Sequence, residues 1–312
     1  MKIAVFGAGG VGGYLGGRLA QGGNDVTFVA RGRHLEAIKA DGLQVRSIKG
    51  DFTVQPGKAT DRPEEIGIVD LVLCCVKSWQ VPEAAVEIQQ MVGPETVVIP
   101  IQNGVEAHTA LSQKIDAEQI LPGLCRIISM IEAPGRIRHL GADPYLEFGE
   151  PSGQVSRRTE NVAQAFAAAQ GLTVHVSRHI LQGLWKKFML IAPWGGMGAL
   201  TRTPIGVFRS LPETRSMLIS SIREVYQVAL ASGVEIEEEA AAGTLALIDM
   251  LPPEGTSSMQ RDIMEGRKSE LYEQCGAVVR FGEKADVPTP VNRFIFHSLL
   301  PLERKARGEI SF

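Results

Sequence analysis

The chain of 312 residues has little of several features that mark whole classes of protein. Its cysteines are Cys74, Cys75, Cys125 and Cys275, at spacings that fit neither a metal site nor a disulfide framework. We therefore expect buried, reduced thiols and no bound metal. The net charge is only −3, without a basic stripe or a pattern for binding single strands, which argues against a nucleic-acid partner.

Long apolar runs are also absent. The longest, residues 188–200, is shorter than a membrane span and contains Pro193 and three glycines. The N-terminus lacks the charged and then apolar segment of a secretory signal. With 44% hydrophobic and 21% charged residues, the composition is that of an ordinary globular protein, and the length suits two domains. We expect a cytoplasmic protein without a membrane partner.

A glycine-rich turn is the most informative feature that the chain does contain. The apolar segment Lys2–Phe6 leads directly into Gly7, Ala8, Gly9, Gly10, Val11 and Gly12, and residues 14–20 read as a helix. This strand, turn and helix are the context of a dinucleotide fingerprint, in which the helix N-terminus presents its N–H groups to the pyrophosphate. A glycine turn without a ligand is the alternative interpretation.

The end of the second apolar strand, Asp25–Ala30, indicates which dinucleotide is bound. NAD enzymes usually place Asp or Glu there to bind the ribose 2′-hydroxyl, whereas this chain has Arg31, Arg33 and His34. A guanidinium binds a 2′-phosphate in bidentate fashion, so we predict NADPH as the cofactor. A solvated basic loop is the alternative.

The order of the apolar segments predicts the fold class. Short strands alternate with helical stretches over the first ~150 residues, which indicates a doubly wound parallel sheet of the Rossmann type. Residues 120–149 carry short β-like runs, which we expect to be antiparallel additions at the sheet edge. After Ser177 the pattern is helical throughout. The sequence thus predicts an α/β protein, with an NADP-binding domain at residues 1–177 and a helical substrate and catalytic domain at 178–312.

Polar side chains at strand ends and on one helix are the candidates for chemistry. Lys77 and Asn103 follow the buried strands expected at 68–76 and 96–101, where ligands of such sheets bind. Lys77 could contact a cofactor phosphate or ribose or be a solvated lysine, and Asn103 could bind ribose or substrate or form an Asn-Gly turn. Residues 185–187 add two lysines in an apolar helix, and from the residues alone a lysine with a solvated head is favoured there.

Taken together, these segments resemble the ketopantoate reductase (2-dehydropantoate 2-reductase) family, from Met1 to about Val291. The matching segments are the glycine turn, Arg31, residues 76–80, residues 102–104, residues 185–187, residues 257–262 and residues 266–270. The resemblance implies an oxidoreductase that reduces ketopantoate to pantoate with NADPH in pantothenate biosynthesis, and it leaves a homodimer possible.

The resemblance also implies site residues. The catalytic lysine falls on Lys187 and its partner glutamate on Glu270. Ser258 would donate a hydrogen bond to the substrate carboxylate, and Asn103 would contact both cofactor and substrate. An ammonium at Lys187 would stabilise the charge that develops on the keto oxygen and deliver the proton.

The chain departs from the family pattern at four positions. The family places asparagines four and eight residues after the lysine, where this chain has Ile191 and Gly195, and Pro193 is expected to bend or interrupt the helix. Tyr272 and Cys275 stand where the family has Asp and Asn. These changes imply an altered, more apolar substrate pocket.

Three hypotheses about function follow. The first is NADPH-dependent reduction of a 2-keto acid, with ketopantoate as substrate. The second is a family member that reduces a different, less polar carbonyl compound. The third is a non-catalytic NADP(H)-binding sensor, against which the retention of Lys187 and Glu270 argues.

Overall fold

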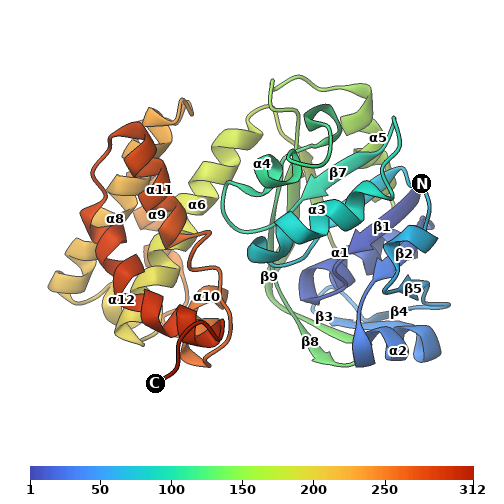
Figure 1. Cartoon of the computed structure of the whole chain (residues 1–312), viewed down its shortest axis with the longest axis horizontal. Coiled ribbons are helices and arrows are strands. Elements are labelled where there is room, and N and C mark those ends of the chain that lie inside the picture. Colours follow the sequence, from blue (N-terminus) through green and yellow to red (C-terminus); the bar gives the residue numbers. More distant parts are fainter. The chain divides into compact units, whose positions relative to one another are not determined.

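The first helix of the chain lies between two β-sheets, and this layering shapes the whole N-terminal half. The computed structural model describes all 312 residues. The chain consists of two compact units, unit 1 (Met1–Gln102 and Glu106–Ile180) and unit 2 (Asn103–Val105 and Leu181–Phe312). The elements are labelled in Figure 1.

Unit 1 contains ten strands and five α-helices. The strands are β1 (Lys2–Phe6), β2 (Asp25–Val29), β3 (Leu43–Ser47), β4 (Phe52–Val54), β5 (Ala59–Thr60), β6 (Leu71–Cys74), β7 (Val97–Pro100), β8 (Gly123–Ala133), β9 (Arg136–Phe148) and β10 (Thr173–Val176). The α-helices are α1 (Gly10–Gln21), α2 (Gly32–Asp41), α3 (Val81–Gln89), α4 (Ala107–Leu111) and α5 (Arg157–Phe166), and 3₁₀ helices lie at Pro63–Glu65, Ser78–Gln80 and Ala117–Gln119.

The first sheet confirms the Rossmann-type expectation. Its strand order is β5-β2-β1-β6-β7, with every neighbouring pair parallel. The order reverses between β1 and β6, which makes the carboxyl ends of these two strands the switch point where such sheets bind ligands. The strand expected at residues 68–76 is shorter than its apolar run, because only Leu71–Cys74 pair and Ile68 is 56% exposed.

The expectation of short antiparallel additions at the edge of this sheet is wrong. Residues 123–148 instead belong to a second sheet, of order β10-β9-β3-β4, in which β8 forms a long antiparallel hairpin with β9. β9 is parallel to β3 and to β10. The physical reason is a second buried layer, since the inward side chains of β9 (Ile137, Leu146 and Phe148) join the core around α1.

Helix α1 is buried between the two sheets because it carries almost no side chains where they approach it. A Cβ at Gly13 would lie 2.7 Å from Ile137 of the second sheet, and one at Gly16 would lie 2.6 Å from Val5 and Phe28 of the first. The glycines of α1 therefore bring the sheets together on its two sides. The opposite face of the first sheet is covered by α3 and α4, which share a second apolar cluster with it.

The cysteines are free thiols, as expected, and three of the four are buried. Burial raises the pKa of Cys74 and of Cys275 to about 12, so neither is a thiolate near neutral pH.

Unit 2 is helical. Its helices are α6 (Ile180–Thr201), α7 (Ile205–Phe208), α8 (Pro212–Ala231), α9 (Ala240–Met250), α10 (Ser258–Met264), α11 (Cys275–Ala285) and α12 (Pro290–Ala306). Helix α8 packs against α9, α11 and α12, and α11 also packs against α12 (Figure 1). Pro193 does not interrupt α6, which continues for eight residues beyond it to Thr201. No helix of the chain combines the length and the apolar character needed to cross a membrane.

Candidate active site

The glycine turn lies at the switch point of the first sheet. It follows β1, whose last residue Phe6 is paired with Cys74 at the end of β6. Gly7 has a φ of +100°, which L side chains rarely adopt. A Cβ at Gly12 would stand 2.1 Å from the carbonyl oxygen of Gly7, so only glycine lets the helix start this close to the strand. These two glycines have the turn and packing roles of a dinucleotide fingerprint.

Gly9 and Gly10 are glycines for different reasons. A Cβ at Gly10 would lie 2.4 Å from the carbonyl oxygen of Ser129 on β8, so packing alone requires glycine there. Gly9 has φ −69°, which any residue adopts, and a Cβ would meet no atom within 4 Å. Neither backbone nor packing demands glycine at Gly9, whereas the close approach of a pyrophosphate would. The first N–H groups of α1, including that of Val11, have no acceptor within the helix, so the turn fits a dinucleotide phosphate.

The end of β2 carries two exposed arginines and no carboxylate. Arg31 precedes the first residue of α2, and its guanidinium forms an ion pair with Glu87 of α3 at 2.9 Å while its side chain stays 69% exposed. Arg33 is exposed in the first turn of α2. An exposed ion pair is weak, so Arg31 can also engage a phosphate. This donor set fits the 2′-phosphate of NADPH better than a bare hydroxyl.

His34 does not belong to that set, although it stands next to Arg33 in the sequence. Its Nδ1 accepts a hydrogen bond from the N–H of Gly135 at 3.0 Å, so the proton is on Nε2, which lies 2.8 Å from the carbonyl oxygen of Ala8. Burial lowers the pKa of His34. The imidazole thus ties the glycine turn to the β8–β9 turn, a structural role that the basic cluster in the sequence conceals.

Lys77 stands just past β6, beside the glycine turn. The preceding residue, Val76, lies within 3.0 Å of where a Cβ on Gly7 would be. Gln102, two residues after the end of β7, donates its amide N–H groups to the carbonyl oxygens of Cys74 (2.8 Å) and Val76 (3.0 Å). The sequence analysis gave Gln102 no role beyond its place in the matching segment 102–104, whereas these two bonds hold the loop that carries Lys77.

Glu270 and Asn103 meet in unit 2. The Glu270 side chain is 3% exposed, and its Oε2 accepts hydrogen bonds from Asn103 Nδ2 at 3.1 Å and from Gln274 Nε2 at 3.2 Å. Helix α11 begins only at Cys275, although the sequence pattern is helical throughout this half, so Glu270 lies in a turn before α11. Sequence reasoning missed Gln274, whose only signal is its position four residues after the glutamate.

The turn that carries Glu270 is anchored by its neighbour Ser269. The backbone N–H and the hydroxyl of Ser269 both donate to the Glu303 carboxylate of α12, the hydroxyl at 2.5 Å. Glu303 is 1% exposed and accepts a further bond from Arg307 at 2.7 Å. The buried Glu303–Arg307 ion pair, together with the two donors of Ser269, therefore holds the backbone next to Glu270 in place.

Lys187 lies on α6, one residue after a lysine with a different environment. Lys186 forms a partly exposed ion pair with Glu237 at 2.6 Å, and Lys187 is half-buried. Ile191 and Gly195 follow Lys187 at four and eight residues, so all three share one face of the helix.

Gly195 is where this face of α6 meets the segment that contains Ser258. A Cβ there would be 2.7 Å from Met259 Cε, 3.2 Å from Ser257 Oγ and 3.3 Å from Gln274 Oε1. Ser257 caps α10 by accepting from the Gln260 N–H, and Ser258 is the first residue of that helix. The space at position 195 is therefore occupied by neighbouring side chains, of which Ser257 and Gln274 are polar and Met259 is apolar.

Tyr272 and Cys275 are structural in this fold. The Cys275 thiol is fully buried and lies 3.6 Å from the carbonyl oxygen of Ala192 on α6. The ring of Tyr272 packs edge-on against Phe296 at 5.6 Å and lies under the Arg307 guanidinium at 4.8 Å. These two departures from the family pattern are thus explained by helix packing.

Glu273 places a second carboxyl beside Glu270. Burial, with a smaller contribution from the Glu270 charge, raises the pKa of Glu273 to about 7, and its Oε2 is buried without a hydrogen-bond partner. Arg307 and Arg280 oppose this effect only in part.

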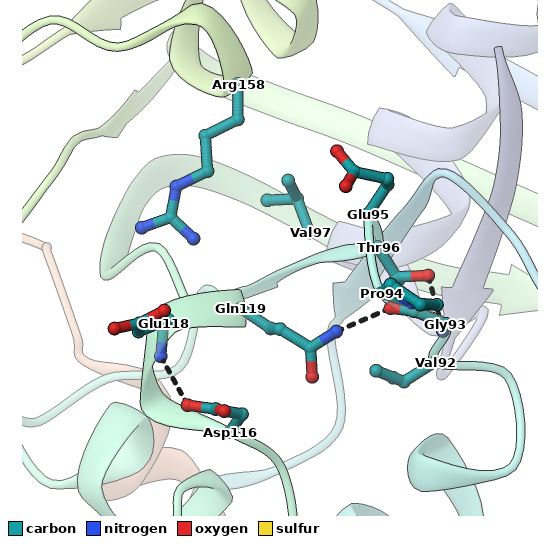
Figure 2. A pocket seen from close by; sticks show the side chains of 10 residues that line it. All are labelled: Val92, Gly93, Pro94, Glu95, Thr96, Val97, Asp116, Glu118, Gln119 and Arg158. Atoms are coloured by element: carbon teal, nitrogen blue, oxygen red, sulfur yellow. Dashed lines mark hydrogen bonds between the residues drawn. The ribbon is translucent and has the colours of Figure 1, made fainter.

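A hollow of about 720 Å³ in unit 1 is not part of this chemistry. It lies at the amino end of β7, opposite to the strand end that leads to Gln102, and is lined by residues 92–97, Asp116, Glu118, Gln119 and Arg158. Figure 2 shows Arg158 across the hollow from the acidic side chains of Asp116 and Glu118. The Arg158 guanidinium is already bound to Glu150, with Nε to Oε1 at 2.7 Å.

Comparison with known proteins identifies the family. Residues 3–153 match the ketopantoate reductase PanE/ApbA family, and residues 179–303 match its C-terminal region. The uncharacterized oxidoreductase YkpB of Bacillus subtilis is 30% identical over 299 residues, covering 96% of this chain and 98% of that protein. The 2-dehydropantoate 2-reductase of Mesorhizobium japonicum is 30% identical over 317 residues, covering 93% and 94%.

A solved structure agrees with these relatives. The PanE/ApbA family ketopantoate reductase from Ralstonia eutropha JMP134 superposes with a TM-score of 0.89 at 30% identity, covering 98% of this chain and all of that one. Its likeness extends over both the sheet-containing and the helical parts. The chain therefore belongs to the ketopantoate reductase family and is an NADPH-dependent oxidoreductase that reduces a keto acid.

Proposed function

We propose that the protein reduces 2-dehydropantoate (ketopantoate) to pantoate in the cytoplasmic synthesis of pantothenate. The observation that carries the proposal is the buried Glu270 carboxylate, which receives two amide N–H groups on one oxygen in the same unit as Lys187. Glycine at position 9, which neither backbone nor packing requires, supports a bound dinucleotide.

We assign cofactor binding to the N-terminal domain (1–177) and the chemistry on the keto acid to the helical domain (178–312). Gly7, Gly9, Gly10, Val11 and Gly12 would hold the pyrophosphate through backbone N–H groups. The 2′-phosphate would be bound by Arg31, and Lys77 and Asn103 would contact the cofactor at the strand ends. The hydride comes from the nicotinamide of NADPH when it is bound.

The residues of the helical domain would handle the charge that develops on the substrate. The Lys187 ammonium would stabilise the negative keto oxygen and then transfer its proton to it, which yields the hydroxyl of the product. Glu270 would orient that ammonium, while the hydroxyl of Ser258 would donate to the substrate carboxylate. Asn103, bound to Glu270 at 3.1 Å, would link substrate and cofactor binding.

A second candidate function is reduction of a less polar 2-keto acid. It is favoured by Ile191 and Gly195 on the Lys187 face of α6, and by Met259, whose terminal methyl lies against position 195. This candidate keeps the same catalytic residues and differs only in the substrate.

The experiment follows the absorbance of NADPH while the purified protein is offered ketopantoate and a panel of other 2-keto acids. Turnover of ketopantoate with the highest kcat/KM supports the first candidate. Turnover confined to acids without a hydroxyl supports the second candidate and rejects the first.

Substitution of the two adjacent lysines tests the assigned chemistry and the sensor alternative. Lys187→Ala should lower kcat by about 10²–10⁴-fold, because general-acid and oxyanion stabilisation are both lost, while NADPH still binds. Lys186→Ala is the matched control and should retain activity, because that lysine pairs with Glu237 at the surface. A protein that binds NADPH but turns over no carbonyl compound would be the sensor.

A further inference from the structure

The side-chain amide of Gln274 uses its nitrogen in a hydrogen bond and leaves its oxygen without one. The residue is 2% exposed, and its Nε2 donates to Glu270 Oε2 at 3.2 Å. An ionised carboxylate only accepts hydrogen bonds, so the amide must present its nitrogen to Glu270 and turn its oxygen away. Glu270 therefore fixes the orientation of the Gln274 amide.

The free end, Oε1, is an acceptor without a donor. No group of the chain donates a hydrogen bond to this oxygen. Oε1 of Gln102 also lacks a donor but is sealed from solvent, whereas Oε1 of Gln274 remains accessible. It stands 3.3 Å from the point where a Cβ on Gly195 would be, on the same helix face as Lys187. A nearly buried acceptor left open to a donor is costly unless something occupies it.

We propose that Gln274 determines substrate specificity by accepting, through Oε1, a hydrogen bond from a hydroxyl on the carbon chain of the 2-keto acid. This inference rests on the proposed function, because it takes the keto acid to be bound beside Lys187 and Glu270. It supplies the polar recognition that Gly195, which has no side chain, cannot provide. Gln274 also positions Glu270 through Nε2, so one side chain links recognition of the hydroxyl to the catalytic carboxylate.

Two substrates that differ by one hydroxyl test the inference. Ketopantoate carries the hydroxyl, and 3,3-dimethyl-2-oxobutanoate is the same acid with hydrogen in its place. The wild-type protein should favour ketopantoate by about 10- to 100-fold in kcat/KM, since the acid without the hydroxyl leaves the buried acceptor without a donor. Gln274→Met keeps the side-chain length but lacks the acceptor, and it should bring this ratio close to one.

The ratio separates recognition from a general defect. Loss of the Nε2 bond to Glu270 lowers turnover of both substrates by the same factor, and that factor cancels in the ratio. Gln260→Met is the matched control, because Gln260 is also a buried glutamine of unit 2 but donates to the Thr203 carbonyl oxygen and accepts from the Ser257 N–H. It should reduce thermal stability and leave the ratio unchanged.

Each outcome has a defined meaning. A ratio that collapses in Gln274→Met but not in Gln260→Met supports the inference. Wild-type turnover of both acids with a ratio near one, or an unchanged ratio in Gln274→Met, overturns the inference and leaves keto-acid reduction intact. Turnover of neither acid by the wild type overturns the proposed function, and the inference with it.

Discussion

Replacing Glu273 by glutamine should stabilise the protein at alkaline pH and leave it unchanged in acid. The Glu273 carboxyl lies in the turn before α11, with one oxygen buried and unpartnered, and burial together with the Glu270 charge raises its pKa from 4.5 to about 7. The glutamine amide introduced by Glu273→Gln is neutral at every pH, so the substitution removes the cost of burying a charge.

The size and sign follow from the pKa of Glu273 in the folded and unfolded chain. A rise from 4.5 to about 7 corresponds to roughly 3 kcal/mol of unfolding free energy. A raised carboxyl pKa means that the folded state binds the extra proton, so this stability is present below about pH 4.5 and is lost as pH rises to about 7. At pH 8 Glu273→Gln should therefore be more stable than the wild type by up to roughly 3 kcal/mol, which is several degrees in Tm.

Thermal unfolding between about pH 4.5 and 8, with wild type and variant in the same buffers, measures this difference. Other titrating groups cancel in the comparison. Glu254→Gln, at an exposed carboxyl, is the control and should show no pH-dependent difference. A Glu273→Gln effect that is equal at the acidic and alkaline ends of the range, or destabilising at the alkaline end, would refute the reasoning.

The remaining predictions concern the cofactor site and the anchor of the Glu270 turn. Arg31→Ser should weaken NADPH binding by about 10- to 100-fold and leave NADH unchanged, as measured by fluorescence titration; equal loss for both cofactors would contradict it. Gly9→Val should weaken NADPH binding at unchanged Tm, whereas Gly10→Val should lower Tm because its side chain would strike β8. Glu303→Gln should lower both Tm and kcat, because it weakens the bonds to Ser269 that hold the turn; full activity in this variant would reject that role.

The sequence sufficed to predict the first sheet because its strands are buried on both faces. β1 and β2 end within one residue of the expected positions, and the glycine turn lies at the switch point as the fingerprint predicts. The Rossmann-type class and the helical character of the second half followed from the same patterns. The second sheet was missed because β8 has exposed side chains at Ile128, Met130 and Ile131, so its apolar pattern lacks a clear alternation.

The sequence predicted the candidate site only at residues that belong to a recognisable motif. Lys187 and Glu270 came from resemblance, since a lysine on an apolar helix or a glutamate in a turn is unremarkable by itself. Pairings between distant segments could not be read from spacing. His34 illustrates this limit, because its contacts with Ala8 and Gly135 depend on how α2 and the β8–β9 turn pack together.

The three residues Asn103–Val105 give the helical unit a piece of the other half of the chain. One of them, Asn103, provides one of the two amide donors to Glu270. A helical domain inherited by recombination at the junction near residue 178 would therefore arrive without this donor. The hydrogen bonding of its glutamate would then depend on the residue that the new N-terminal domain carries after the strand equivalent to β7. Asn103 and Glu270 are therefore coupled by one hydrogen bond, although 167 positions separate them in the sequence.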